Sequence, residues 1–356
     1  MDTMIYEIFS FLCIPDLLMI ACVNKHLLNT SRNYVWPQKY IITSEYKYTT
    51  QILRHYVFEC YFFRDSCDLT IIRNNCWTQN NRITIMYCKD MINRMDKLNF
   101  FNQIICYQCN GFSNDHLKYL TNCDSIRLLC CNITDDGLSF LKNCREIILQ
   151  DCRITGEGLS KIIDYEYIDL SCSDITDKGI IGIKSKKLIL RGCKNITDYG
   201  ILNVKCNYLD ISECTLVTDE GIENINCDEL KISNCPGLNY TNIECLKCKK
   251  INVSDTWKIN DVILEQFKKF EEVDVSNCSQ ITDLGLSYLV NCKILKICDC
   301  FQITRQGILQ LSCEKIALCD CMCQHAISQD CLKEIRKKLM CLISYNHDCD
   351  NYWKYW

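Results

Sequence analysis

Residues 206–222 read CNYLDISECTLVTDEGI, and residues 270–286 read FEEVDVSNCSQITDLGL. In both stretches two apolar residues flank a single residue, a Cys follows three positions later, and an Ile/Val-Thr-Asp-x-Gly turn comes next. The frame recurs every 20 to 22 residues, with the first strand residue of each unit at Ile83, Ile104, Ile126, Ile147, Ile168, Leu188, Leu209, Leu230, Ile251, Val273, Leu295 and Ile316. Twelve units in register predict a repeat protein in which each unit packs on its neighbours.

Each position of the unit has a structural role. Pairs such as Leu209 and Ile211 share one face of a short strand, because side chains alternate with period two, and this face turns into the core. A small residue follows at Cys88, Cys109, Cys131, Cys152, Ser173, Cys193, Cys214, Cys235, Thr256, Cys278, Cys300 and Cys321. Free Cys behaves as a small hydrophobic residue with a weak S–H donor, so we expect this column to be buried.

The turn that follows predicts a helix start. Thr-Asp pairs such as Thr197-Asp198 offer oxygens that cap the N–H groups of a short helix. Close packing or unusual backbone angles would explain the glycines that recur in this turn, Gly137, Gly158, Gly179, Gly200, Gly221, Gly285 and Gly307. A second Cys opens many units, at Cys123, Cys144, Cys206, Cys227, Cys248, Cys292 and Cys313. The two columns together absorb 17 of the 32 cysteines.

The pattern over about residues 80–325 resembles the cysteine-containing class of leucine-rich repeats, Cys-x-x-Leu-x-Leu-x-x-Cys-x-x-Ile-Thr-Asp-x-Gly-Leu. This resemblance implies an α/β solenoid, a horseshoe of about twelve repeats. Two units depart from the pattern: residues 235–246 have Asn239-Tyr240 in place of the Thr-Asp turn, and residues 256–264 lack the Cys and the Gly.

Composition argues against several function classes. The 356 residues carry a formal net charge of -4, so no strongly basic surface gathers nucleic acid. The apolar run from Phe9 to Val23 lacks a basic leader and contains Pro15 and Asp16, which favours a helix over a signal peptide. No stretch approaches the roughly 18 apolar residues of a membrane helix. We therefore expect a soluble protein of a reducing compartment, the cytoplasm or nucleus, with neither nucleic-acid nor membrane partners.

The amino-terminal residues 4–36 predict a small three-helix cap by apolar periodicity alone. They also resemble an F-box through Glu7, Phe9, Ser10, Leu12, Pro15, Leu17, Leu18, Ala21, Val23, Lys25 and Trp36, although the usual leading Leu-Pro is absent. The resemblance implies docking on the Skp-type adaptor of a cullin-based ubiquitin ligase. The adaptor-binding residues would be Ile5, Ile8, Phe9, Leu12, Pro15, Leu17, Leu18 and Trp36.

Four segments follow from these patterns. Residues 1–40 form the F-box-like helical module, 41–80 a linker and N-terminal cap, 81–325 the repeats, and 326–356 a C-terminal cap helix with an aromatic tail. Few Pro among abundant Ile, Asn, Lys and Tyr is typical of an AT-rich genome, such as that of a large DNA virus or a protist.

The candidate metal ligands and catalytic residues have a simpler explanation in the repeat. The segment CDCMCQH at 319–325 and the C-x-x-C pairs Cys106/Cys109 and Cys245/Cys248 offer metal ligands, but they lie in the repeat frame, which favours core positions over zinc. The five His residues sit in no motif for nucleophilic catalysis, and every clustered Gly belongs to the repeat turn. We expect a non-catalytic protein without cofactor or metal.

The residues between and beside the inward strand positions should project from the concave sheet, the surface that repeat proteins commonly use for binding. The expected substrate-binding residues are Tyr107, Arg127, Ile148, Tyr167, Asp169, Ile189, Arg191, Tyr208 and Asp210. The sequence thus predicts the substrate-recognition subunit of a Skp-cullin-F-box ubiquitin ligase with an unidentified protein substrate. The alternative is a repeat scaffold for protein partners that has no ubiquitin-ligase role.

Overall fold

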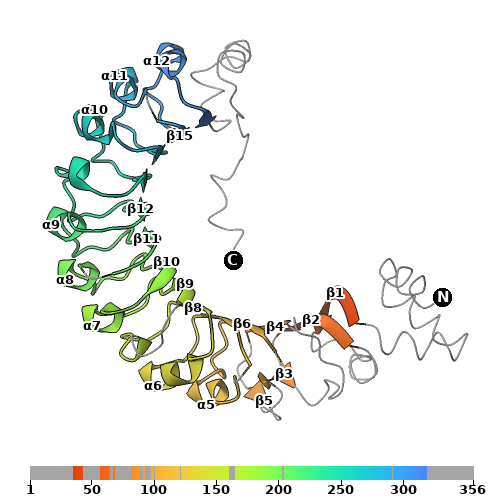
Figure 1. Ribbon diagram of the computed structural model, residues 1–356. Coiled ribbons are helices and arrows are strands. Elements are labelled where there is room, and N and C mark those ends of the chain that lie inside the picture. The colour runs from red at the N-terminus through yellow and green to blue at the C-terminus, as the bar shows by residue number, and fades with distance from the viewer. Residues whose placement is uncertain are drawn as a thin grey trace, which may run out of the picture. The chain divides into compact units, whose positions relative to one another are not determined.

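The computed structural model describes residues 35–42, 57–64, 67–68, 82–87, 91–92, 98–99 and 101–318, except 121, 160–164, 203 and 291. Figure 1 shows the described elements as ribbons. The chain divides into two compact units, Met1–Asp169 and Leu170–Trp356. Among the described residues, no helix has both the length and the apolar character that crossing a membrane requires.

The first unit is built on parallel strands, each paired with the strand of the preceding repeat. In order of pairing they are β1 (Val35–Ile42), β2 (Val57–Arg64), β4 (Arg82–Met86), β6 (Gln103–Tyr107), β7 (Ser125–Leu129), β8 (Glu146–Gln150) and β9 (Tyr165–Asp169). The pairing places Ile83, Ile104, Ile126, Ile147 and Ile168 side by side. Short helices α5 (Asn114–Leu117) and α6 (Asp135–Leu138) follow β6 and β7, and the short strands β3 (Cys67–Asp68) and β5 (Met91–Ile92) pair separately.

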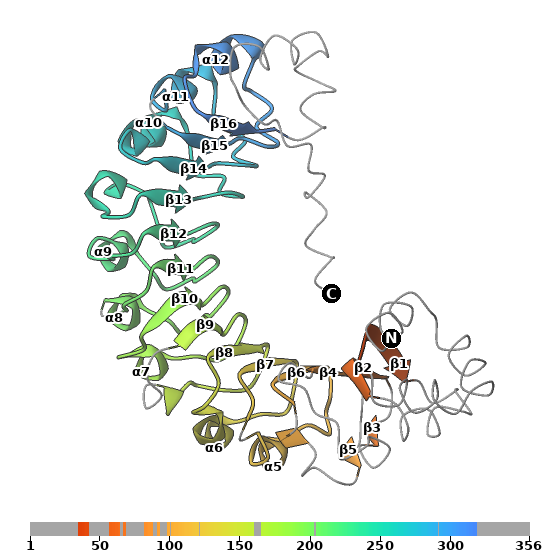
Figure 2. The same ribbon diagram turned by 45° about the vertical axis from the view of Figure 1, so that its right-hand side comes forward.

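The second unit repeats this arrangement, and its strands after the first are shorter: β10 (Ser185–Ile189), β11 (Tyr208–Asp210), β12 (Glu229–Lys231), β13 (Lys250–Asn252), β14 (Glu272–Asp274), β15 (Ile294–Lys296) and β16 (Lys315–Ala317). The helices are α7 (Asp177–Ile180), α8 (Asp198–Ile201), α9 (Asp219–Ile222), α10 (Asp261–Leu264), α11 (Asp283–Ser287) and α12 (Arg305–Gln310). Figure 2 shows these helices on the side of the unit opposite its strands. All twelve predicted strand starts lie in parallel strands, so the leucine-rich-repeat prediction is confirmed for this range.

The core of each unit lies between its strands and its helices. The two inward-facing residues of a repeat are fully buried, as at Leu209 and Ile211. Helix residues such as Leu286 close the core from the other side. The divergent unit at 235–246 keeps its core through Tyr240, which is 0% exposed and donates its hydroxyl to the Ile232 carbonyl at 3.0 Å. A 3-10 helix, Ile243–Cys245, replaces the α-helix there. The large Tyr side chain therefore fills the core of this unit, while its backbone N–H donates to Asp219 of the preceding turn at 3.0 Å.

The Thr-Asp-x-Gly turns bond to one another from repeat to repeat. Thr282 caps its own helix α11, because its hydroxyl accepts from the Leu284 N–H at 3.2 Å. Asp261, one repeat earlier, accepts from the Thr282 N–H at 2.8 Å and from its hydroxyl at 2.6 Å. The same contact joins Asp135 to Thr155, Asp177 to Thr197, Asp198 to Thr218 and Asp283 to Thr304. The sequence predicted that both the Thr and the Asp cap the helix. The Asp carboxylate instead accepts hydrogen bonds from the Thr of the next turn.

This bonding explains most of the recurrent glycines. A Cβ built on Gly285 would overlap Oδ1 of Asp261, the carboxylate that bonds to Thr282. Gly200, Gly221 and Gly307 meet the aspartate of the preceding turn in the same way, and Gly137 meets Asn114. Of the two explanations that the sequence left open, close packing holds at these positions. Gly158 is different, because its φ of +114° requires a glycine on backbone grounds.

The parallel sheet begins earlier than the sequence pattern indicated. Strand β1 pairs with β2, and β2 pairs with β4, so two strands precede the first predicted repeat. Both lie in ranges that the sequence assigned to the end of the helical module and to the linker. Trp36, an expected adaptor-binding residue, is part of β1 and pairs with Phe58. This corrects its placement in the helical module, because its backbone belongs to the sheet.

Candidate protein-interaction surface

The strands present their outward side chains in regular rows, which we call the strand face of each unit. In the first unit the central row is Thr84, Ile105, Arg127, Ile148 and Asp169. In the second unit it is Ile189, Asp210, Lys231, Asn252, Asp274, Lys296 and Ala317. Because side chains alternate between the two faces of a strand, the residues of one row all project from the same face, and each lies beside its counterparts in the neighbouring repeats.

In most repeats a left-handed residue that is not glycine follows the strand. Glu213, Asn234, Asp255 and Asn277 have φ between 49° and 61°, and the same position is left-handed in most other repeats. Asn and Asp tolerate this conformation better than most residues, which explains their frequency here. The Glu213 N–H donates to the Ser233 carbonyl at 2.9 Å. The left-handed turn thus continues the pairing between repeats and then directs the next residue into the core.

That next residue is the predicted Cys column. The Cys214 thiol donates to the Leu190 carbonyl of the preceding repeat at 3.1 Å, and Cys235 and Cys300 donate likewise to Ile211 at 3.2 Å and Val275 at 3.1 Å. Thr256 takes the place of the Cys in its repeat, and its hydroxyl accepts from the Asn234 N–H of the preceding repeat at 2.8 Å. The expectation of small buried residues is confirmed at every position of the column except Cys88 and Cys321, which lie outside the described residues. The polar atoms of the column connect neighbouring repeats.

Burial sets the chemistry of these thiols. It raises the pKa of Cys235 to about 12 and that of Cys300 to about 12, well above the value of a free thiol. Such thiols stay protonated at neutral pH and are poor nucleophiles and poor metal ligands. No group of three or more His, Cys, Asp or Glu in the described ranges is placed to hold a metal ion. The segment 319–325 lies outside those ranges.

The first unit contains five of the expected substrate-binding residues. Tyr107, Arg127 and Tyr167 are half-buried on the strand face, whereas Ile148 is only 5% exposed. Asp169 is also 5% exposed, because its carboxylate accepts from the Gln150 amide at 2.6 Å and from the Tyr167 hydroxyl at 3.5 Å. The expectation that Ile148 and Asp169 project into solvent is therefore wrong, although both belong to the expected row.

The second unit contains the other four, and its strand face is dominated by ion pairs. Arg191 bonds to Glu213 at 2.6 Å, and Ile189 and Tyr208 are half-buried, with the Lys187 ammonium 4.5 Å from the centre of the Tyr208 ring. Asp210 is only 4% exposed, since its carboxylate accepts from the Ser212 N–H at 2.9 Å. Its expected projection into solvent is likewise corrected.

Sequence reasoning missed a further set of strand-face contacts in this unit. The ammonium group of Lys250 lies 3.0 Å from Glu272 and 3.9 Å from Glu229, and that of Lys296 lies 3.6 Å from Asp274. Aligning the repeats would have shown acids and lysines in adjacent units at the same position. Because the lysines of these pairs are exposed, solvent screens the attraction and each pair contributes little to stability. They leave the charges of this strand face mutually compensated.

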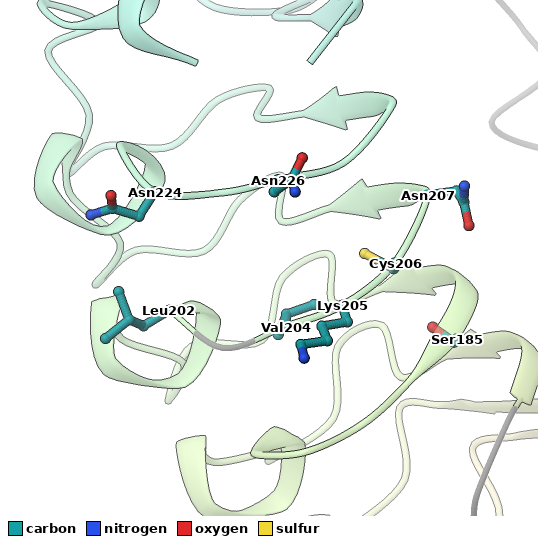
Figure 3. A pocket seen from close by; sticks show the side chains of 8 residues that line it. All are labelled: Ser185, Leu202, Val204, Lys205, Cys206, Asn207, Asn224 and Asn226. Atoms are coloured by element: carbon teal, nitrogen blue, oxygen red, sulfur yellow. The ribbon is translucent and has the colours of Figure 1, made fainter. Parts of the chain in front are cut away.

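An open pocket of about 510 Å³ lies between the segments that follow α8 and α9 (Figure 3). Its lining is mostly polar: Ser185, Leu202, Val204, Lys205, Cys206, Asn207, Asn224 and Asn226. The Asn207 amide donates to Asp228 at 2.8 Å, and burial raises the pKa of Cys206 to about 12. The pocket therefore brings together amides and one ammonium group, without a base beside an activated nucleophile.

Ile5, Ile8, Phe9, Leu12, Pro15, Leu17 and Leu18, the other expected adaptor-binding residues, lie outside the described residues.

Comparison with protein families agrees with the repeat assignment over part of the chain. The family model "Leucine Rich repeat" matches residues 145–162 and 166–184. A search of curated protein sequences finds no match. An internalin from Listeria monocytogenes shares 15% identity, covering 71% of this chain and 84% of that chain, with a TM-score of 0.46. The structure of the Rad7 and Elc1 complex in yeast matches with 14% identity, 95% and 86% coverage, and a TM-score of 0.39.

Proposed function

We propose that the chain is a non-catalytic adaptor whose strand faces hold a protein partner. The observation that carries this proposal is the register of the repeats, which holds half-buried Tyr, Arg, Ile and Lys side chains in continuous rows on each unit. The backbone beneath them is bonded from repeat to repeat, so little conformational freedom is lost on binding. Aromatic and Arg side chains are also those in which binding energy concentrates at protein interfaces.

The second half of the proposal concerns the amino-terminal module. Residues 1–40 dock on the Skp-type adaptor of a cullin-based ubiquitin ligase, and the chain acts as the substrate receptor of that ligase. The support is the resemblance of Glu7, Phe9, Pro15, Leu17 and Leu18 to the F-box pattern, followed by repeats that present binding faces. A scaffold without a ubiquitin-ligase role shares the strand faces and differs only in lacking this contact.

Co-purification with a recombinant Skp-type adaptor tests the adaptor contact. Wild-type chain should form a complex that survives gel filtration, and the double variant Leu17→Asp, Leu18→Asp should lose it while its far-ultraviolet circular dichroism is unchanged. The matched control is Leu202→Asp with Leu216→Asp, since these leucines are 48% and 52% exposed in the second unit. Wild-type chain that binds no Skp-type adaptor would leave the scaffold function in place of the ligase function.

The partner contact is tested separately on the second unit. Arg191→Ala with Tyr208→Ala removes two half-buried side chains without opening the core, because their inward neighbours Leu190 and Leu209 are untouched. A partner captured by wild type and identified by mass spectrometry should bind this variant more weakly while adaptor binding persists. Equal capture by the double variant would argue against this strand face as the contact.

A further inference from the structure

Arg127 is the one cationic side chain of the first unit's central row, and it has no acidic partner there. Its register partners on the two neighbouring strands are Ile105 and Ile148. No carboxylate of the described residues lies within 4.0 Å of its guanidinium group, and Glu146, diagonally across on β8, makes no ion pair with it. The side chain is nevertheless half-buried. A partly desolvated cation between isoleucines is an uncommon arrangement, because desolvation disfavours an unpaired charge.

The second unit supplies the contrast. There Arg191 pairs with Glu213, Lys231 lies 3.8 Å from Asp210, and Lys296 lies 3.6 Å from Asp274. These cations are compensated within their own strand face. Arg127 is not compensated in this way. Strand β8, which carries Ile148, lies between the strand of Arg127 and that of Asp169, and the Asp169 carboxylate already accepts from Gln150 and Tyr167. Two strand spacings place those backbones about 10 Å apart.

The surroundings of Arg127 are apolar on three sides. Ile105 and Ile148 flank it along the row, and Leu129 follows it on the same strand face of β7. Tyr107 pairs with Leu129 in register, and both are half-buried. The Tyr107 ring lies edge-on to that of Tyr87, with 5.3 Å between the ring centres. Figure 2 shows the three strands β6, β7 and β8 that carry these residues side by side. An extended segment laid on them meets one guanidinium group among apolar side chains.

We propose that this part of the strand face, defined by Ile105, Tyr107, Arg127 and Leu129, binds a partner segment with one Asp or Glu between apolar side chains. The inference rests on the proposed partner-binding function and specifies its partner. A guanidinium group presents donors that match both oxygens of a carboxylate. A carboxylate carries one negative charge and is compensated by a single Arg, whereas recognition of a phosphorylated side chain generally uses a cluster of cations.

Selection of peptides from a random display library on the immobilised full chain tests this occupant. The enriched peptides should carry an acidic residue between apolar residues, and the synthetic form should bind in fluorescence polarisation. Arg127→Gln should weaken that binding about 10- to 100-fold, the loss expected for a hydrogen-bonded charge contact. Arg127→Glu should abolish it. The matched control is Arg153→Gln, an exposed arginine of a turn in the same unit, which should bind as wild type does.

A second measurement identifies the contact itself. The peptide with its acid changed to the amide should bind wild type as weakly as the acidic peptide binds Arg127→Gln, and the two losses should not add. Several results would overturn the inference: no enriched peptide, peptides without an acid, equal binding by Arg127→Gln, a phosphopeptide that binds more tightly, or self-association abolished by Arg127→Glu. If a captured partner still depends on Arg191 and Tyr208 while these peptides fail, the proposed function stands and this inference falls.

Discussion

Replacing Gly285 by Ala tests whether the inter-turn aspartate dictates the recurrent glycine. The new methyl group would overlap Oδ1 of Asp261, whose carboxylate bonds to the Thr282 N–H and hydroxyl at 2.8 and 2.6 Å. Overpacking of this kind costs about 1–3 kcal/mol. Displacing the carboxylate also weakens hydrogen bonds to a charged group, each contributing about 1.5–3 kcal/mol when fully formed. Because these bonds are only partly buried, water offsets part of the loss, and we expect a total of about 2–4 kcal/mol.

A double-mutant cycle separates this collision from a general helix effect. In an Asp261→Ala background the carboxylate is gone, and the nearest remaining contact is Leu264 Cδ1 at 3.0 Å, the end of a flexible side chain. Ala is favoured over Gly within a helix by about 0.5–1 kcal/mol. Gly285→Ala should therefore change from destabilising to nearly neutral or stabilising in that background.

The assay is urea denaturation of the four proteins, followed by circular dichroism. Hydrogen exchange of α10 and α11 accompanies it, because repeat arrays need not unfold in one step. The collision predicts faster exchange in Gly285→Ala than in wild type, and no further acceleration around α11 when Gly285→Ala is added to Asp261→Ala. An equal penalty for Gly285→Ala in both backgrounds would refute the reasoning, since the cost would then be independent of the carboxylate.

Three further predictions concern buried groups. Burial raises the pKa of Cys300 to about 12, so this thiol should resist an alkylating reagent at pH 8 while exposed Cys172 reacts. The contribution of Cys300 to stability should be present below the pKa of the unfolded thiol and be lost as pH rises toward 12. Rapid labelling of Cys300 in the native protein, followed by mass spectrometry, would contradict this. Burial lowers the pKa of His116, whose Nδ1 accepts from the Ser113 N–H at 3.1 Å, so stability should be full above the ordinary His pKa and fall on acidification. The protection of α5 amides, measured as exchange relative to the intrinsic rate at each pH, should fall at pH 5 in wild type but not in His116→Gln, which keeps an acceptor. An equal fall in both proteins would count against the His. Tyr240→Phe should lower the free energy of unfolding by about 1–3 kcal/mol, because it leaves the buried Ile232 carbonyl without that donor, and an unchanged urea midpoint would show that the bond contributes nothing.

Strand positions and the inward residues were predictable from sequence because both depend on a period that recurs in every unit. Leu209, Ile211 and Cys214 occupy the predicted core positions, and the structure buries all three completely. The period also predicted where the helices start. The strand positions, core residues and helix starts depend on alternation along a strand and on contacts between the same position of adjacent repeats. The pattern of one repeat is therefore enough to place them in every other repeat.

Exposure on the strand face was not predictable in the same way. Asp210 and Asp169 occupy outward positions, yet a strand-end N–H and neighbouring side chains enclose their carboxylates. Strand alternation states only the side of the sheet, whereas burial depends on how far neighbouring side chains reach across it. The adjacent strands β1 and β2 were missed for a related reason, since they pair through backbone groups without carrying the repeat's turn.

The sequence by itself determined the repeat, its register and the identity of its core residues, because these follow from local periodicity. Only the tertiary structure decided why Gly285 is required, since the aspartate that excludes a side chain there comes from the preceding turn. It also decided that Arg191 is paired while Arg127 has no carboxylate of the described residues within 4.0 Å. Both outcomes depend on which side chains adjacent repeats bring together, and that is set by packing across the sheet rather than by position along the chain.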